Sequence, residues 1–275
     1  MTRRIVLFFA FLLILLPQFL IAGTVTERIQ ATNTLVVGTP GDFPPFSAAT
    51  IRGTMIGLDI DLAKNLAAGL GVKLKLQQME FAKLIPAVKD GTIDIALSGI
   101  TMMPGRNMEV AFIGPYAASG QALLGSKEQI AAITSNEDLA TLSIRLAALK
   151  GTTSEKAARE GLRNAKITLT DTHDQSLMLL LGGKVDAILA DFPFCKVAEA
   201  RYADHDFAVL DQPLTFEPLG IAVSGDDPLF INLIQNYLIL MEGTGTLNKM
   251  KERWFKHGDW IKELPDMNFF KDLKQ

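Results

Sequence analysis

Short apolar runs alternate with amphipathic segments through most of the chain. Residues 34–39 are rich in β-branched side chains and are followed by Pro-Gly, which is typical of a strand that ends in a turn. Residues 59–70 carry leucines four positions apart and stop at Gly71, which predicts a helix with one apolar face. Alternation of apolar and basic residues in 72–76 predicts the next strand.

The same succession of strands and helices continues toward the end of the chain. Further strands are expected at 93–97, 142–149, 166–169, 185–189 and 219–223. Further helices are expected at 81–88, 154–162, 174–181, 192–203 and 227–242, with a last helix around Trp254. Alternating strands and helices predict an α/β fold of parallel sheets with helices on both faces. Two such blocks of similar size indicate two lobes.

The N-terminal segment differs from the rest. Two arginines precede an unbroken apolar run at residues 5–16, and the segment ends on small residues. This order is typical of a secretory signal peptide, and the run is short for the ~20 apolar residues that cross a bilayer. We therefore expect residues 1–23 to be a cleaved signal peptide and the protein to be periplasmic. An uncleaved segment would tether it to the membrane.

The composition narrows the range of functions. The 275 residues are 48% hydrophobic and 21% charged, as in a folded globular protein. The formal net charge is −3, and without the N-terminal segment 25 basic and 30 acidic residues remain, so no nucleic-acid partner is expected. The one cysteine is Cys195, and His173, His205 and His257 are expected to be scattered surface imidazoles. We expect no internal disulfide, no metal site and no cofactor.

Candidate ligand-binding residues lie where predicted strands end and helices begin, the edge at which open α/β sheets bind ligands. They are the Pro/Gly-rich loop 38–47 with Phe43, the helix start at Phe81, the segment 98–106 with Arg106, the helix start at 151–154, and Asp191.

These residue types suit an α-amino acid. The planar guanidinium of Arg106 can hold a carboxylate through two parallel, charge-assisted hydrogen bonds. Backbone N–H groups at the helix start near Thr152 and Thr153 would share the anionic charge. Asp191 would accept hydrogen bonds from the ammonium group, and two phenylalanine rings would clamp the side chain.

Each of these residues also has a plainer interpretation. A lone arginine such as Arg106 is more often a solvated surface charge, and phenylalanines are more often core residues than ligand contacts. Asp191 would also serve as the N-cap of the following helix, and Thr152 and Thr153 as ordinary N-caps. Their joint placement at strand ends favours a ligand site.

Longer motifs extend this pattern. Residues 57–63 read Gly-Leu-Asp-Ile-Asp-Leu-Ala, and residues 98–106 read Ser-Gly-Ile-Thr-Met-Met-Pro-Gly-Arg before Phe112 and Pro115-Tyr116. With these motifs the sequence resembles the bacterial extracellular solute-binding proteins, family 3, which are the periplasmic amino-acid-binding proteins of ABC transporters. The resemblance covers about residues 35–258.

The resemblance implies a two-lobed α/β fold in which each sheet is mostly parallel. The first lobe would comprise residues 24–117 and 216–275 and the second residues 118–215, with hinge crossings near 117–120 and 212–218. The lobes would close over an amino acid by hinge bending. A monomer would then deliver the amino acid to an inner-membrane ABC permease.

For the carboxylate of the ligand, the resemblance implies pairing with Arg106, helped by the backbone N–H groups of Thr101 and Thr153. Met103 and Gly105 stand where the family usually has Thr and Glu. The loop therefore lacks two polar side chains that would brace Arg106.

For the ammonium group, the resemblance implies Asp191, the Ser98 side chain and the Gly99 carbonyl. It also implies that Phe43 and Phe81 flank the side chain of the ligand.

The acidic residues near the matched pocket indicate which class of side chain the ligand carries. Pro40 stands where members that bind basic or amide side chains often carry Asp. Only Asp42 and Glu80 remain as acidic residues near the matched pocket. This favours a neutral amino acid.

Two other functions stay open beside the receptor. Cyclohexadienyl dehydratases resemble the same family and place a Glu three residues after the Asp that aligns with Asp191. Here that position is Phe194, which cannot act as a general acid, and Cys195 has no histidine nearby in sequence. The other alternative is a periplasmic sensor or accessory module. We expect a receptor and not an enzyme.

Overall fold

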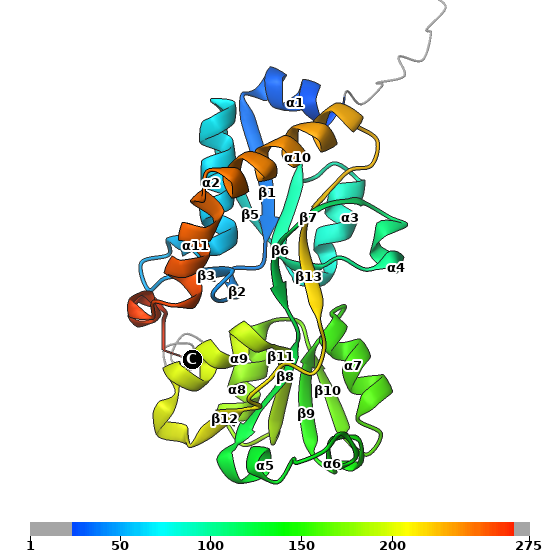
Figure 1. Cartoon of the computed structure of the whole chain (residues 1–275), viewed down its shortest axis with the longest axis vertical. Coiled ribbons are helices and arrows are strands. Elements are labelled where there is room, and N and C mark those ends of the chain that lie inside the picture. The colour runs from blue at the N-terminus through cyan, green and yellow to red at the C-terminus, as the bar shows by residue number, and fades with distance from the viewer. Residues whose placement is uncertain (1–23, 267–275) are drawn as a thin grey trace, which may run out of the picture.

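The computed structural model describes residues 24–266; the predicted signal peptide, residues 1–23, and residues 267–275 lie outside the described residues. Two lobes are stacked along the long axis of the molecule, each with its own five-stranded sheet (Figure 1). No helix within residues 24–266 is both long and apolar enough to cross a membrane.

Each lobe alternates strands and helices. The first lobe contains α1 (Val25–Thr32), β1 (Thr34–Thr39), β2 (Asp42–Phe43), β3 (Ser47–Ala49), β4 (Met55–Ile56), α2 (Leu58–Leu70), β5 (Lys73–Gln78), η1 (Phe81–Lys83), α3 (Leu84–Lys89), β6 (Ile95–Thr101), α4 (Pro104–Asn107), β7 (Ala111–Ser119), β13 (Glu217–Val223), α10 (Pro228–Gly243), α11 (Thr246–Phe255) and η3 (Asp259–Glu263). The second lobe contains β8 (Gln121–Ser126), α5 (Lys127–Ala131), α6 (Asn136–Thr141), β9 (Arg145–Leu149), α7 (Thr153–Gly161), β10 (Lys166–Thr170), α8 (His173–Leu181), β11 (Ala187–Asp191), α9 (Phe192–Arg201), η2 (Ala203–His205) and β12 (Phe207–Val209).

The two sheets have the same plan. The first has the order β5-β1-β6-β13-β7, in which β5, β1 and β6 are parallel while β13 is antiparallel to both of its neighbours. The second has the order β10-β9-β11-β8-β12, with β8 antiparallel to its neighbours. The α/β class and the two lobes are confirmed. The sheets are mixed because β13 in the first sheet and β8 in the second, the strands by which the two crossings enter each lobe, run against the strands that alternate with helices.

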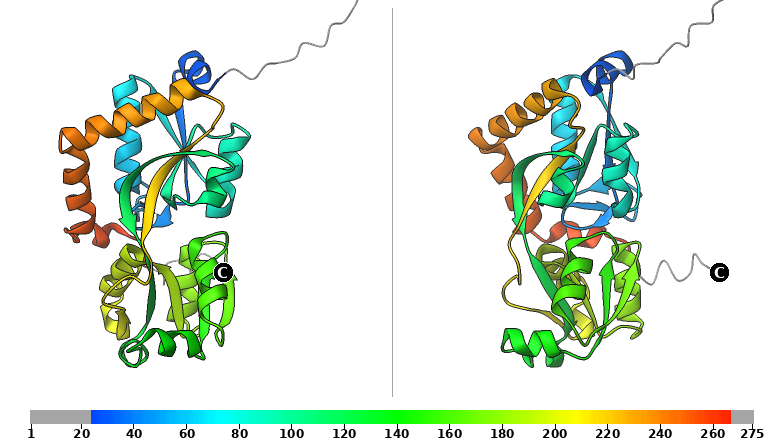
Figure 2. Two further views of the ribbon diagram at one scale, coloured as in Figure 1. Left: turned by 45° about the vertical axis from the view of Figure 1, so that its right-hand side comes forward. Right: turned by 90° about the vertical axis from the view of Figure 1, so that its right-hand side faces the viewer.

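The two crossings between the lobes run side by side (Figures 1 and 2). One leads from β7 into β8, and the other leads from β12 into β13. Glu217, at the start of β13, is paired with Ser119 at the end of β7. Within residues 24–266, the lobes are therefore connected by these two extended crossings.

Some element boundaries differ from the sequence-based expectation. The strand predicted at 142–149 begins at Arg145, because residues 136–141 form α6. The helix predicted at 81–88 begins as a 3₁₀ turn, η1, and continues as α3.

Side-chain caps start two of the helices, α7 and α10, at the residues where the sequence predicts them. The Thr152 side chain accepts a hydrogen bond from the Glu155 N–H at 3.3 Å, which starts α7 at the end of β9. The Asp227 side chain accepts from the Phe230 N–H at 3.0 Å, and Pro228 follows it, as the sequence predicts for the start of α10.

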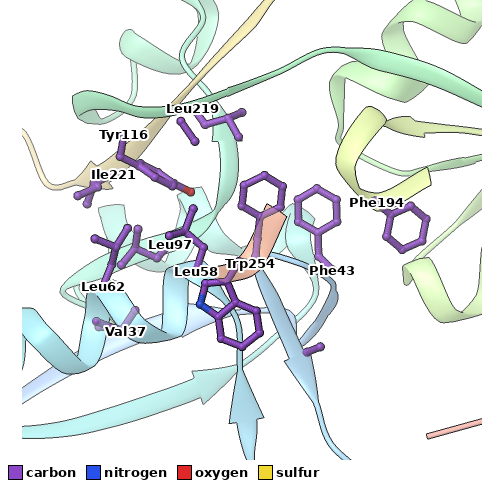
Figure 3. Close-up of a cluster of buried hydrophobic side chains, with 14 of the residues drawn as sticks. Val37, Phe43, Leu58, Leu62, Leu97, Tyr116, Phe194, Leu219, Ile221 and Trp254 are labelled. Atoms are coloured by element: carbon purple, nitrogen blue, oxygen red, sulfur yellow. The ribbon is translucent and has the colours of Figure 1, made fainter. Parts of the chain in front are cut away.

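The largest apolar cluster extends from the first lobe into the second. Within the first lobe, Tyr116, Leu58 and Leu97 are fully or almost fully buried between α2 and the sheet (Figure 3). Phe43 and Phe194 lie at the seam between the lobes, with ring centroids 5.9 Å apart. Burial of these two aromatic side chains therefore stabilises the closed arrangement.

Candidate functional site

Arg106 extends from α4, just beyond the end of β6, toward the second lobe. Its Nη1 donates to the Thr101 carbonyl at 3.0 Å, and its Nη2 donates across the crevice to the Gly151 carbonyl at 3.1 Å. Gly151 has φ +76°, and a Cβ there would lie 3.2 Å from the Cβ of Ala82 in the first lobe. A glycine is thus required where the two lobes approach this closely.

The guanidinium of Arg106 is braced without the Thr and Glu side chains that the family pattern has in this loop. Its Cζ lies 5.4 Å from the centroid of the Phe81 ring, a cation–π contact. Burial lowers the pKa of Arg106, and the nearby carboxylates of Glu217 and Asp191 counteract that shift. One face of Phe81 therefore supports Arg106. The expected contact of Phe81 with the ligand side chain stays a prediction.

Glu217 is a central residue of the crevice that the sequence analysis missed. It is 5% exposed, and its Oε2 accepts from the Thr101 hydroxyl at 2.6 Å and from the Thr153 hydroxyl at 2.8 Å. Its Oε1 accepts from Gln121 Nε2 at 2.9 Å and from the Thr215 hydroxyl at 3.0 Å. These donors come from both lobes and from the crossings, so Glu217 ties the closed crevice together. The sequence did contain a signal for Glu217: it is a charged residue at the start of the apolar strand 217–223, inside a predicted crossing.

Asp191 ends β11 and occupies the N-cap position of α9, but its side chain makes no capping hydrogen bond. The second helical position is Pro193, which has no N–H to donate. The carboxylate instead accepts from the Ser119 hydroxyl at 2.7 Å. Burial, and then the charge of Glu217, raises the pKa of Asp191 to about 7. The helix-cap interpretation of this side chain is therefore wrong, and Asp191 faces the crevice that contains Arg106 and Glu217.

Ser98 and Gly99 are consecutive buried residues of β6. The Ser98 side chain is fully buried, and its hydroxyl oxygen has no hydrogen-bond partner among the described residues. Gly99 has φ +53°, and its N–H donates to Asp59 Oδ2 at 2.9 Å and to the Tyr116 hydroxyl at 3.1 Å. A Cβ on Gly99 would lie 2.7 Å from Phe43 Cε1, so the ring of Phe43 covers this backbone.

Thr152 and Thr153 have different roles. The Thr152 hydroxyl caps α7 and donates to the Leu149 carbonyl at 2.5 Å, so for its side chain the ordinary N-cap interpretation holds. Thr153 is the first residue of α7, and its hydroxyl reaches Glu217. Both residues lie beside Arg106 and Gly151 at the mouth of the crevice, where they line a cavity of about 430 Å³.

An aromatic wall faces the other end of the crevice. Phe43 stacks on Phe46 at 5.0 Å and on His173 at 4.5 Å, and His173 lies 4.6 Å from Phe194. His173 is 4% exposed, so the expectation of a surface imidazole is wrong for this residue. It begins α8 and is carried inward by the closure of the second lobe, which the sequence spacing of histidines does not reveal. His205 and His257 are exposed, as expected.

Cys195 and the potential metal-ligating side chains of residues 24–266 lack the surroundings that a reactive thiol or a metal site needs. Burial raises the pKa of the Cys195 thiol, and the side chain is buried, so it has the environment of an inert thiol. No group of three or more His, Cys, Asp or Glu side chains in this range has the geometry of a metal site.

The two lobes, the two crossings and the polar crevice between them define a class of proteins that bind a small ligand by hinge closure. Residues 35–257 match the profile of the bacterial extracellular solute-binding proteins, family 3, and the chain belongs to this family. The recognition made from the sequence motifs is confirmed.

Relatives of the chain include both binding proteins and an enzyme. The cyclohexadienyl dehydratase of Pseudomonas aeruginosa is 27% identical over 84% of this chain and 86% of its own length. The ABC transporter arginine-binding protein 1 of Escherichia coli is 25% identical over 88% of this chain and 96% of its own length.

Solved structures similar to this chain are also amino-acid-binding proteins or components of ABC transporters. An ancestral amino-acid-binding protein, described as a precursor of cyclohexadienyl dehydratase, is 38% identical with a TM-score of 0.77, covering 84% of this chain and 100% of its own. A putative ABC transporter binding component from Wolinella succinogenes, complexed with lysine, is 34% identical with a TM-score of 0.79, covering 84% of this chain and 99% of its own.

Proposed function

We propose that this protein is a periplasmic receptor that binds an L-amino acid between its lobes and delivers it to an ABC importer. The observation that carries the proposal is that Arg106 and Asp191 come from different lobes and interact electrostatically in one buried crevice. A zwitterionic amino acid needs a cationic group beside its carboxylate and an anionic group beside its ammonium group, as far apart as those two ends of the ligand. Family membership and the amino-acid-binding relatives support the same conclusion.

In this receptor Arg106 takes the carboxylate of the ligand. Its guanidinium is already oriented by the Thr101 and Gly151 carbonyls, so little side-chain entropy is lost on binding. The start of α7 at Thr153 adds backbone N–H groups and the positive end of the helix dipole.

The ammonium group is taken by Asp191 at the opposite side. The Ser98 hydroxyl is a second acceptor, because it is buried and its oxygen has no hydrogen-bond partner among residues 24–266. Closure removes both ligand ends from water, so each end must be paired for binding to be favourable.

An enzyme on this scaffold is the second candidate, favoured by the cyclohexadienyl dehydratase relative. The position at which the resemblance places the general acid is Phe194, whose side chain is 1% exposed and packs on His173. A hydrocarbon ring exchanges no proton. We therefore infer a receptor and not an enzyme. Turnover of prephenate or arogenate, followed by NMR, would reverse this inference.

Isothermal titration of the purified protein with each of the twenty L-amino acids tests the receptor function. We expect specific binding of at least one, and a loss of ~2–5 kcal/mol in its binding free energy in Arg106→Ala, because a buried charge then has no partner. Arg52→Ala, in an exposed turn, is the matched control and should bind as the wild type does. Unchanged affinity in Arg106→Ala, or no binding by any of the twenty, would overturn the proposal.

Localisation, boundaries and assembly are parts of the same proposal. We infer cleavage near residue 23, a monomer in the periplasm and an inner-membrane ABC permease as partner. The hinge would divide the chain into residues 24–117 with 216–275 and residues 118–215. Mass spectrometry of the exported protein's N-terminus tests the cleavage, and X-ray scattering with and without ligand tests both the monomer and the closure.

A further inference from the structure

A second cavity lies between the lobes, apart from the polar crevice. Its volume is about 400 Å³, within the usual range of small-molecule sites. One wall is α9 of the second lobe, and the other is the end of α11 with η3 of the first lobe (Figure 1). The residues that line it do not include Arg106, Asp191 or Glu217. The amino-acid receptor function therefore does not account for this cavity.

The lining of the cavity is largely apolar and aromatic. Trp254, Phe255 and Trp260 come from the first lobe, and Phe192 and Val197 come from the second. Trp254, Trp260 and Val197 are at most 8% exposed. Flat aromatic walls from two sides favour a ligand that contains an aromatic ring.

The indole N–H of Trp260 lacks an acceptor. Its Nε1 is buried and has no hydrogen-bond partner among the described residues. The neighbouring Trp254, with ring centroids 5.3 Å apart, donates from its own Nε1 to Asp61 Oδ2 at 2.8 Å. A buried indole N–H usually has a partner, and one without a partner is costly. A ligand with an acceptor group would satisfy Trp260.

The charged side chains at the cavity are basic. Lys196 of α9 lines it together with Lys256 and His257, which follow α11, and no Asp or Glu of residues 24–266 is part of the lining. Lys256 pairs with Glu252 at 3.1 Å and Lys196 pairs with Glu199, each on its own helix. The two lysine side chains are 69% and 49% exposed, and ion pairs of this kind contribute little. Their ammonium groups can therefore turn toward a negatively charged acceptor.

We propose that this cavity is a second binding site, and that its ligand is a small aromatic carboxylate. The ring of the ligand lies among Trp254, Trp260 and Phe192. Its carboxylate accepts from the Trp260 indole N–H and from Lys196 and Lys256, one from each lobe. One molecule then fills the apolar volume, satisfies the buried donor and balances the basic charge.

The cavity shares a wall with the amino-acid crevice. Asp191 faces the crevice, while Phe192 and Pro193, the next two residues, line the cavity. Ala118 also lines the cavity and precedes Ser119, whose hydroxyl donates to Asp191 at 2.7 Å. The two sites are therefore separated only by the start of α9 and by one of the crossings.

This arrangement couples the two sites. A molecule that contacts both lobes binds their closed arrangement more tightly than an open one, so it favours closure. By linkage, the aromatic carboxylate raises the affinity for the amino acid, and the amino acid raises the affinity for the carboxylate by the same factor. The coupling rests on the proposed receptor function, whereas the second site does not.

Phenylacetate is a direct probe of the second site. It joins an aromatic ring to a carboxylate and has no ammonium group for Asp191. The two tryptophans of the chain, Trp254 and Trp260, both line the cavity, so tryptophan emission reports its occupancy. We expect a saturable change of emission, with the same dissociation constant in isothermal titration.

Two analogues test the chemical class of the ligand. Phenylacetamide has the same shape without the charge and should bind about tenfold more weakly, the lower end for a hydrogen bond to a charged group. Acetate has no ring and should leave the emission unchanged. Equal binding of phenylacetamide, or no emission change at millimolar phenylacetate, would overturn the proposal.

Variants of the basic residues place the probe in the cavity. The double variant Lys196→Gln with Lys256→Gln removes one cation from each lobe and should weaken phenylacetate about tenfold. Lys73→Gln with Lys184→Gln removes the same charge from exposed positions of the same two lobes and should leave the affinity unchanged. Equal affinity of the two double variants would overturn the site.

A filling variant tests the volume of the cavity. Ala200 lines the cavity from an exposed position of α9, so the ring of Ala200→Phe should occupy it and abolish phenylacetate binding. Ala203→Phe, which is exposed and outside the lining, should bind as the wild type does. Full binding by Ala200→Phe would overturn the proposal. If this variant does not fold, as judged by circular dichroism, the lysine variants still decide.

The last measurements separate this proposal from the receptor function. Arg106→Ala should lose the amino acid and keep phenylacetate, whereas loss of phenylacetate would place the probe in the crevice and overturn the second site. Saturating phenylacetate should raise the affinity of the wild type for its amino acid at least threefold, and an unchanged affinity would overturn the coupling. Binding of phenylacetate but of none of the twenty amino acids would overturn the receptor function and leave the second site in place.

Discussion

The protonation of Asp191 makes amino-acid binding depend on pH near neutrality. Its pKa is about 7 because the carboxyl group is buried and lies near Glu217, while the Ser119 hydroxyl and the charges of His173 and Arg106 act in the opposite direction. An ammonium group pairs only with the ionised carboxylate. Lowering the pH should therefore weaken binding, because a proton must first leave Asp191.

The size of the effect follows from that pKa. With a pKa of about 7, roughly 76% of Asp191 is ionised at pH 7.5 and about 3% at pH 5.5. The ratio predicts ~25-fold weaker binding at the lower pH, equivalent to ~1.9 kcal/mol. At pH 6 binding should release ~0.9 proton per ligand, and at pH 8 only ~0.1.

Isothermal titration in buffers of different ionisation enthalpy measures both the affinity and the proton release. Asp191→Asn should bind more weakly at all pH values and lose most of the pH dependence. His173→Gln controls for the neighbouring imidazole and should keep it. Equal affinity at pH 5.5 and 7.5 with no proton release in the wild type would refute the reasoning, because Asp191 would then be ionised already or would not contact the ligand.

Two further predictions concern the support behind the site. Gly99→Ala should weaken ligand binding at least tenfold and lower the melting temperature, because φ is +53° and the new Cβ would lie 2.7 Å from Phe43. Gly105→Ala is the control and should change neither quantity, because a Cβ at Gly105 meets open space. Equal behaviour of the two variants in thermal melts and titration would contradict the predicted role of Gly99. Burial raises the pKa of Asp59 from 3.8 to about 7, so its contribution to stability is present below about pH 4 and is lost as the pH rises through 7, a change of up to ~4 kcal/mol. Asp59→Asn should flatten that decline in denaturant unfolding between pH 5 and 8, whereas an identical decline in the variant would exclude Asp59 as its source.

Local patterns in the sequence anticipate a large part of the fold. The run 34–39 and the leucine spacing in 59–70 depend on contacts within one strand or one helix, and both elements form nearly where expected. Asp227 and Pro228 start α10 because capping needs only neighbours in sequence. The boundary at Arg145 was missed because three residues separate the end of α6 from the start of β9, and periodicity does not resolve so short a connection.

The candidate site was anticipated only where it lies at strand ends. Arg106 follows the last residue of β6 by five positions, and Asp191 is the last residue of β11, so the topology of an α/β sheet brings both to the edge where strands end. The role of Phe81 beneath Arg106 was not anticipated, because it depends on the position of one side chain over another. Whether each residue binds ligand stays a prediction until the titrations are done.

The amino-acid sequence by itself determined the alternation of strands and helices, the caps that begin α7 and α10, and the motifs of the family. Only the tertiary structure decided that Glu217 joins Thr101, 116 residues away, and that His173 meets Asp42, 131 residues away. Hydrophobic periodicity indicates which face of its own helix or strand a residue occupies. Burial of a carboxylate between two lobes depends instead on how the two crossings set one sheet against the other.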